Sequence, residues 1–96
     1  MRNDRFEWDD DKARLNLRKH GVDFEDACRA IDDPNALIEA DDEPDEERWQ
    51  TIGLAADQVL FVIWTERHGN IIRIISARKA TREEENRYNR QAHPQG

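Results

Sequence analysis

Hydrophobic and polar positions alternate most clearly in the second half of this chain. Residues 59–67 and 70–78 are rich in Val, Ile and aromatic side chains, a composition typical of β-strands. Residues 68–70 suit the tip of a hairpin between them. A shorter alternation over residues 48–53 predicts another strand, and residues 54–58 predict the turn that follows it.

Two segments near the start have the apolar spacing and the terminal residues of α-helices. The first is capped by Asp9 or Asp10 and runs to about His20, where Gly21 ends it. The second fits Phe24–Asp32, because its apolar residues recur at helical spacing. We expect both helices to pack on one face of the sheet.

A final helix and two short strands complete the predicted order. Thr81 and Glu84 have the spacing of a capping box, which predicts a helix from Thr81 to about Gln91. Residues 6–8 and 36–39 add short strands. Grouped helices and consecutive strands are typical of an α+β fold, with an antiparallel sheet of about four strands.

Length and composition indicate one domain over residues 1–96. Charged residues make up 39% of the chain, so the core is small and the surface densely ionic. The longest apolar run, residues 59–64, is too short to span a bilayer. The start of the chain lacks the apolar stretch of a secretory signal, and Cys28 is the one cysteine. We therefore expect a cytoplasmic protein that does not bind membranes.

The formal net charge of −7 is unevenly distributed. Residues 1–57 contain 8 basic and 18 acidic side chains, whereas residues 58–96 contain 7 basic and 4 acidic ones. Residues 39–47 hold seven carboxylates, whose mutual repulsion predicts a solvated loop. The alternative, a calcium-binding loop, is disfavoured because the glycine of that pattern is absent. Residues 92–96 are expected to be disordered. The basic second half predicts an anionic partner despite the negative total.

Strict alternation assigns the hairpin side chains to two faces. The face expected to cover the first two helices carries Val59, Phe61, Ile63, Thr65, Arg67, Ile72, Ile74, Ser76 and Arg78. The opposite face carries Leu60, Val62, Trp64, Glu66, Ile71, Arg73, Ile75 and Ala77. On this second face Glu66 and Arg73 form either a structural ion pair or part of a site.

The cations of the hairpin fall into two groups. Arg67 and Arg78 end different strands, so they lie at opposite ends of the hairpin, roughly 26 Å apart. The tip group comprises Glu66, Arg67, His68 and Arg73. The far group comprises Arg78, Lys79 and Arg82, at a helix N-terminus that favours anions, with Tyr88 on the same helix. The far group indicates either an anion site or simply a basic turn.

A polar stripe on the first helix adds a further candidate. Lys12, Asn16 and His20 recur at every fourth position and share one helix face. Histidine ordinarily changes charge near neutral pH, so His20 is a candidate general acid or base, or a plain cation at a helix end. The chain has no glycine-rich phosphate loop and no histidine cluster, which predicts chemistry without a metal or cofactor.

Several segments together resemble a known family, the BrnT toxins. The resemblance covers residues 6–90 and rests on Phe6-Glu7-Trp8-Asp9, Lys12, Asn16, Lys19-His20-Gly21-Val22, Phe24, Asp33-Pro34, Arg48, Ile52-Gly53, Thr65-Glu66-Arg67 and Arg73 through Glu83. It implies a RelE-like α+β fold and a metal-independent endoribonuclease, the toxin of a type II toxin–antitoxin system. It further implies a ribbon-helix-helix antitoxin, DNA contact only through that antitoxin, and repression of the operon by the complex.

The resemblance also implies roles for individual residues. Arg78 is expected to face the scissile phosphate, with Lys79 and Arg82 assisting. The candidates for the acid or base are His20, Glu66 and Tyr88, and those for binding RNA or the antitoxin are Lys12, Arg67 and Arg73. The acidic run at residues 83–85 departs from the family. The alternative is a non-catalytic module that binds the antitoxin and contributes to repression.

Overall fold

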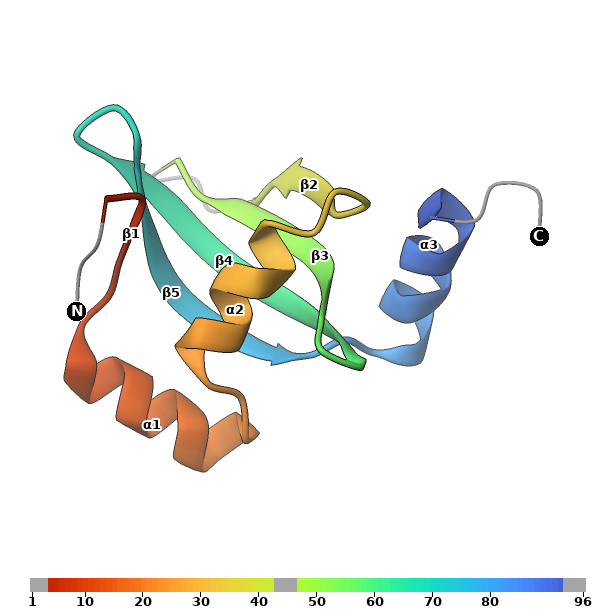
Figure 1. Ribbon diagram of the computed structural model, residues 1–96, viewed down its shortest axis with the longest axis horizontal. Helices are drawn as coiled ribbons and strands as arrows, with labels where there is room; N and C mark the ends of the chain where they lie inside the picture. Colours follow the sequence, from red (N-terminus) through yellow and green to blue (C-terminus); the bar gives the residue numbers. More distant parts are fainter. Residues whose placement is uncertain (1–3, 43–46, 93–96) are drawn as a thin grey trace.

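The computed structural model describes residues 4–42 and 47–92 of an α+β fold (Figure 1). Its elements are β1 (Phe6–Glu7), α1 (Asp10–His20), α2 (Phe24–Ile31), β2 (Leu37–Ala40), β3 (Trp49–Ala55), β4 (Gln58–Arg67), β5 (Ile71–Lys79) and α3 (Arg82–Ala92). The predicted order of helices and strands is confirmed. Ala92 ends α3 and is not part of a disordered tail; residues 93–96, like residues 43–46 of the predicted acidic loop, lie outside the described ranges.

The sheet has five strands in the order β1-β5-β4-β3-β2 and is mixed. The expectation of about four antiparallel strands is wrong, because β1 pairs in parallel with β5 through Phe6–Ile72 and Glu7–Arg73. Parallel neighbours need a long crossover rather than a tight turn. The sequence therefore contains no local signal for the partner of a two-residue strand at the start of the chain.

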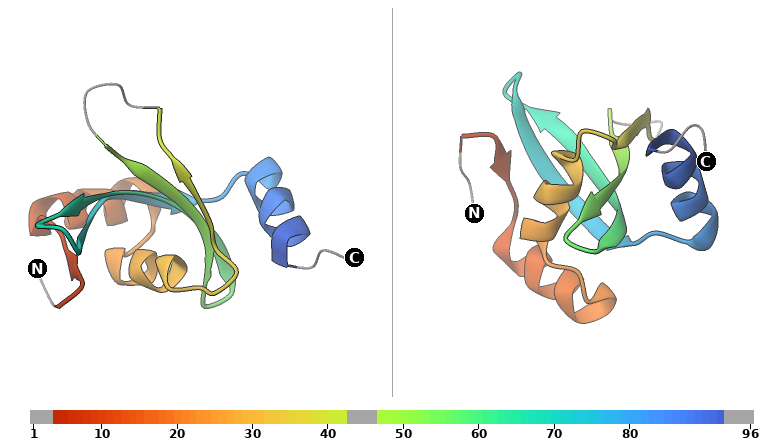
Figure 2. Two further views of the ribbon diagram at one scale, coloured as in Figure 1. Left: turned by 90° about the horizontal axis from the view of Figure 1, so that it is seen from above. Right: turned by 45° about the vertical axis from the view of Figure 1, so that its right-hand side comes forward.

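Most of the core residues of the β4–β5 hairpin lie on the face that was not expected to cover the helices. The core cluster consists of Phe6, Trp8, Val22, Phe24, Ala27, Ala30, Ala55, Leu60, Val62, Trp64, Ile74 and Ala77. It lies between the sheet and α2; Figure 2 shows α2 against one face of the sheet, α1 beside the β5 edge and α3 standing apart, so the expectation that both first helices pack on that face holds for α2 only. The prediction that Val59, Phe61 and Ile63 cover the helices is therefore wrong.

An irregularity in the strand pairing explains part of this error. Ile63 pairs with Ser76, but the next residue, Trp64, pairs with Ile74. Ile75 is thus an extra residue, and a bulge of this kind reverses the alternation along a strand. It places Ile74 and Ala77 on the same buried face, three positions apart. Strict alternation cannot anticipate such a shift.

Close contact between β3 and α2 depends on Gly53. A Cβ atom added there would lie 2.1 Å from the carbonyl oxygen of Ala30 in α2. Real Cβ atoms do not approach an oxygen so closely, so only glycine permits this spacing. The helix consequently packs directly on the strand backbone, with Ala27 and Ala30 fully buried.

Candidate functional site

Asn16 fastens α1 along the edge of β5. Its side-chain amide donates to the carbonyl oxygens of Ala77 (2.8 Å) and Val22 (3.0 Å), and its Oδ1 accepts from the backbone N–H of Ala77 (3.1 Å). The short strand β1 pairs with β5 further back, at Ile72 and Arg73. Asn16 therefore satisfies backbone groups that a longer neighbouring strand would otherwise bond.

A hollow of about 360 Å³ opens between α1 and β5 beside this contact. It is lined by Lys12, Leu15, Asn16, Lys19, His20, Ile75 and Ser76. Lys12 and Lys19 are exposed, whereas His20 is half-buried. The predicted polar stripe of Lys12, Asn16 and His20 thus faces β5. Lys19 lines the same hollow, so two lysines lie near the imidazole of His20.

Arg78 lies next to this hollow on β5. Ala77 is buried towards the core, so its neighbours Ser76 and Arg78 point to the opposite face of the strand. Ser76 lines the hollow, and His20 lies about one helical turn, roughly 6 Å, beyond Asn16, which holds Ala77. Arg78 does not itself line the hollow, but it follows Ser76 by two positions on the same face of β5.

The Arg78 guanidinium is held on three sides. Nη1 and Nη2 donate to the two carboxylate oxygens of Glu84, at 2.8 and 3.0 Å. Nη1 also donates to the carbonyl oxygen of Lys79 (3.1 Å), and the group lies 4.1 Å from the centre of the Phe61 ring. The hydrogen bonds from Arg78 lower the pKa of Glu84, although burial opposes this shift.

Glu84 is fixed by the predicted capping box, which is confirmed. Its backbone N–H donates to the hydroxyl of Thr81 (3.2 Å), and the backbone N–H of Thr81 donates to its carboxylate (2.8 Å). Lys79 and Arg82 are exposed on either side of this junction. The far group thus forms a basic turn at the start of α3, with one carboxylate in its centre.

Comparison with known proteins decides the family. A family model described as "Ribonuclease toxin, BrnT, of type II toxin-antitoxin system" matches residues 8–84. The chain belongs to the BrnT family. The resemblance to the BrnT toxins found in the sequence is therefore confirmed. Membership of the family implies an RNA substrate and an antitoxin partner.

A solved BrnT structure agrees with this assignment. The crystal structure of the Brucella abortus ribonuclease toxin BrnT has 26% sequence identity and a TM-score of 0.65, covering 81% of this chain and 97% of that one. No curated protein matches. The range that matches the BrnT family model includes the α1–β5 hollow and ends at Glu84.

The tip group of this BrnT chain lies at the other end of the β4–β5 hairpin. Arg67 pairs with Ile71 at the tip, whereas Lys79 lies at the far end, opposite Leu60. The expectation that Glu66 and Arg73 share a face of the hairpin is wrong, because Arg73 pairs with Thr65 and Glu66 with Ile72. Arg73 instead donates to Glu7 of β1 at 2.8 Å. The parallel β1–β5 pairing, which the sequence did not reveal, supplies this partner. Glu66, Arg67 and His68 are exposed.

Tyr88 fastens α3 to the loop after α2. Its hydroxyl donates to Oδ2 of Asp33 at 2.5 Å. Burial, together with this carboxylate, raises the pKa of Tyr88 to about 12. Burial also raises the pKa of Asp33, but hydrogen bonds from Tyr88 and from the backbone N–H groups of Asn35 and Leu54 outweigh it and lower the pKa overall. Sequence reasoning missed Asp33, for which the Asp33-Pro34 pair was the available signal.

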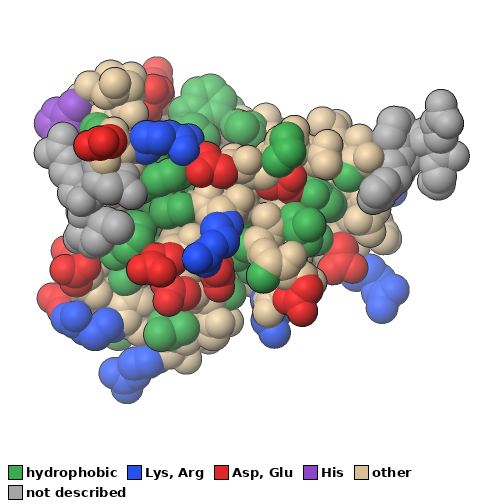
Figure 3. Space-filling model, in the orientation of Figure 1, with side chains coloured by type: hydrophobic (Ala, Val, Ile, Leu, Met, Phe, Trp, Pro, Cys, Tyr) green, Lys and Arg blue, Asp and Glu red, His purple; other side chains and the backbone are tan. Residues whose placement is uncertain are grey.

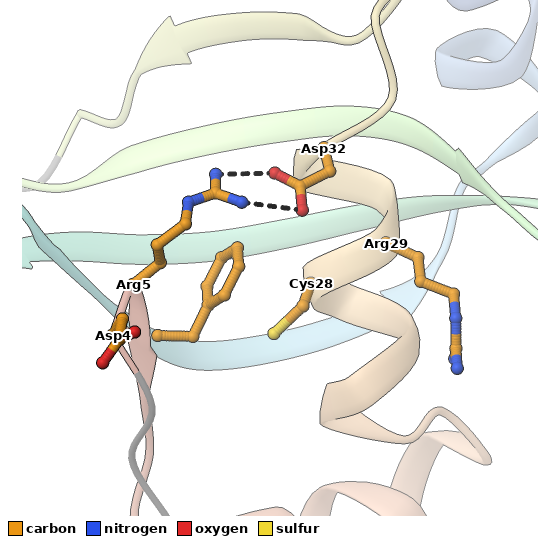
Figure 4. Close-up of a pocket in the computed structure, with 6 residues that line it drawn as sticks. Asp4, Arg5, Cys28, Arg29 and Asp32 are labelled. Carbon is orange, nitrogen blue, oxygen red and sulfur yellow. Dashed lines mark hydrogen bonds and ion pairs between the residues drawn. The ribbon is translucent and has the colours of Figure 1, made fainter.

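A larger hollow, of about 600 Å³, lies between β1 and α2 (Figure 4). Arg5 donates to both carboxylate oxygens of Asp32 there, at 3.0 and 2.7 Å. Burial, with Asp32 and Glu25 nearby, raises the pKa of Cys28 to about 12. A thiol that stays protonated at neutral pH is a poor nucleophile, so this hollow offers weaker chemistry than the one at β5.

Charges of both signs are mixed over the face of the molecule that carries α2. Figure 3 shows acidic and basic side chains interspersed over the face that carries α2, with hydrophobic side chains between them. Among residues 4–42 and 47–92, His, Cys, Asp and Glu form no cluster able to hold a metal ion. Within the same ranges no helix is long and apolar enough to cross a membrane.

Proposed function

We propose that this chain is an endoribonuclease toxin that cleaves RNA without a metal ion at the junction of α1 and β5. Membership of the BrnT family supports the activity. The observation that supports this location is the hollow in which Lys12, Lys19 and His20 face β5 at Ser76, two positions before Arg78. The lining of the larger hollow between β1 and α2 contains neither a lysine nor a histidine.

The chemistry of metal-independent cleavage matches these side chains. A base removes the proton of a ribose 2′-hydroxyl, and the 2′-oxygen attacks the adjacent phosphorus. The bond from phosphorus to the 5′-oxygen breaks, an acid protonates that oxygen, and a 2′,3′-cyclic phosphate remains. His20 supplies the base or the acid, while Arg78 stabilises the charge that develops on the phosphate.

The remaining candidates have supporting roles in this proposal. Lys12 and Lys19 bind phosphates that flank the cleaved one, and Lys79 and Arg82 extend the same basic path. Arg67 and Arg73, at the other end of the hairpin, contact RNA or the antitoxin. Of the other two acid–base candidates, Tyr88 has its hydroxyl engaged by Asp33, and Glu66 lies at the tip of the hairpin, too far from Arg78 to act on the same phosphate.

We further propose a cytoplasmic toxin whose antitoxin is a DNA-binding protein of the ribbon-helix-helix type, through which the complex contacts operator DNA. The second candidate function is a non-catalytic module that binds this antitoxin. The specific observation in its favour is the Arg78–Glu84 pair, which occupies the proposed phosphate ligand in the free protein.

The test is cleavage by purified protein of free RNA in EDTA and, separately, of ribosome-bound messenger RNA in the magnesium buffer that ribosomes require. We expect 2′,3′-cyclic phosphate ends from the wild type and at least about a hundredfold slower cleavage by Arg78→Ala and His20→Ala. Lys19→Ala should slow cleavage, whereas Arg18→Ala, the matched control one position away on α1 and outside the hollow, should not.

Three outcomes contradict the proposal. Cleavage of free RNA that disappears in EDTA would assign the reaction to a metal ion. Equal cleavage by the wild type and both variants would remove the site from this junction. Absence of cleavage on either substrate, together with tight binding of the antitoxin, would favour the non-catalytic module.

A further inference from the structure

Arg78 has its phosphate-binding edge already occupied. A guanidinium binds a phosphate best through two parallel N–H donors. In this chain Nη1 and Nη2 make that paired contact with the carboxylate of Glu84. Phe61 lies against the guanidinium plane, and Lys79 takes a further bond from Nη1. A phosphate that approaches this edge meets a carboxylate in its place.

We propose that Glu84 is a built-in competitor for RNA at Arg78, so that a phosphate binds there only when the Glu84 side chain swings away. This inference rests on the proposed role of Arg78 as a phosphate ligand. The carboxylate imitates the phosphate in charge and in its two acceptor oxygens. Glu84 therefore lowers the affinity of the free protein for RNA, and only an RNA that binds Arg78 more strongly than this carboxylate does can displace it.

The surroundings of Glu84 permit this exchange without unfolding. Its side chain is 17% exposed and that of Arg78 is 37% exposed, so both can reach water. α3 stays in place through other contacts, since Tyr88 bonds to Asp33 and Arg87 donates to Glu39 at 2.7 Å. The competition consequently requires rotation of one side chain rather than release of the helix.

The neighbouring glutamates do not share this role. Glu83 and Glu85 are exposed on the same first turn of α3, whereas Glu84 is half-buried and directed at Arg78. Each of the three contributes one negative charge. A specific competitor and a general repulsion of RNA by an acidic helix therefore predict different results when single glutamates are neutralised.

Anisotropy titrations with a fluorescein-labelled, 2′-O-methyl single-stranded RNA test the proposal, since this probe binds without being cleaved. Glu84→Gln should bind it about three- to tenfold more tightly than the wild type, the effect of freeing one partly exposed ion-pair partner. Glutamine retains the capping box, so α3 should persist by circular dichroism. Glu85→Gln, the matched change in charge, should alter affinity less than twofold.

Further variants separate this inference from the proposed function. Arg78→Ala should weaken binding, and adding Glu84→Gln to it should restore nothing. If Arg78→Ala binds like the wild type, the role of Arg78 fails and the competitor fails with it. If Arg78→Ala binds weakly but Glu84→Gln gains no more than Glu85→Gln, or binds no probe, the competitor alone is overturned.

Glu84→Asp provides a second measurement should Glu84→Gln fold poorly. It keeps the charge but shortens the side chain by one methylene, which strains the paired contact with Arg78. A competitor that works by reach predicts tighter RNA binding by Glu84→Asp than by the wild type. Unchanged affinity would show that charge alone acts, and would contradict the proposal.

Discussion

Asn16 shows what single residues conceal at the sequence level. Its spacing from Lys12 and His20 correctly indicated a shared helix face. The spacing did not reveal that Asn16 is buried, because its hydrogen-bonding partner, Ala77, is 61 positions away. Polar residues on a periodic stripe are ordinarily solvated, and only the arrangement of the chain distinguishes a solvated asparagine from a structural one.

Glu84 is a second case at this scale. The capping box with Thr81 could be read from the sequence, since it depends on a local spacing. Its other contact, with Arg78, depends on the angle at which α3 leaves β5. The run of three glutamates therefore indicated an acidic helix, but not which of them contacts the site.

The tyrosine that fastens α3 provides a test by titration. The chain has one tyrosine, so tyrosinate absorbance reports Tyr88 alone. Because its pKa is raised to about 12, the native protein holds this proton more tightly than the unfolded chain does. The resulting stabilisation is complete below about pH 10 and is lost as pH rises towards about 12.

We expect a midpoint near 12 for the native protein and near 10 in guanidinium chloride, where the ordinary value for tyrosine applies. Asp33→Asn should move the native midpoint towards 10, since it removes a negative acceptor but leaves the burial. A native midpoint equal to the unfolded one would show that the Tyr88–Asp33 bond is absent in solution.

Whole elements were predicted better than their packing. The ranges of α1 and α2 and the order of the strands followed from apolar spacing and capping residues. The buried face of the β4–β5 hairpin did not: β4 alternates regularly, but both of its faces are apolar and the period of two does not say which one meets the helices. In β5 the extra residue, Ile75, also shifts the alternation, which places Ile74 and Ala77 on the same side.

Packing of α2 on β3 gives a prediction at the element scale. Gly53→Ala should lower the free energy of unfolding by about 2–3 kcal/mol, because its Cβ would meet the backbone oxygen of Ala30 and force α2 outward. Gly21→Ala is the matched control: its φ of 69° is strained for alanine, but its surroundings are open, so about 1 kcal/mol is expected.

Urea unfolding of both variants measures this difference. A loss for Gly53→Ala no larger than that for Gly21→Ala would mean that α2 moves at little cost. The close contact seen between the helix and the strand would then not be required by the fold.

For the whole molecule, the charge distribution explains how an acidic protein can act on RNA. The net charge of −7 opposes association, but the cations gathered where α1 meets β5 provide a local positive field. The opposite net charges of residues 1–57 and 58–96 indicated an anionic partner for the second half of the chain. That the lysines of α1 lie along the strand that carries Arg78 could not be inferred, because it depends on the placement of β1 and α1 beside β5.

The salt dependence of RNA binding measures this local field. Contacts through Lys12, Lys19, Arg78 and Lys79 predict a slope of log K against log salt of about −2 to −3, at about −0.7 per phosphate on a single strand. Lys19→Ala should reduce its magnitude by about 0.7, and Arg18→Ala should leave it unchanged. A slope near zero would exclude phosphate contacts as the source of affinity.

The placement of α1 against β5 also determines when, during synthesis of the chain, the proposed site can form. The lysines and the histidine emerge early, but the strand that completes the site, and the backbone that Asn16 bonds, belong to the last quarter of the chain. A translation product that stops before β5 has the early cations but neither Arg78 nor a surface to hold α1 in place. Such a fragment lacks the proposed site, so we expect interrupted synthesis to release an inactive peptide rather than a partly active one.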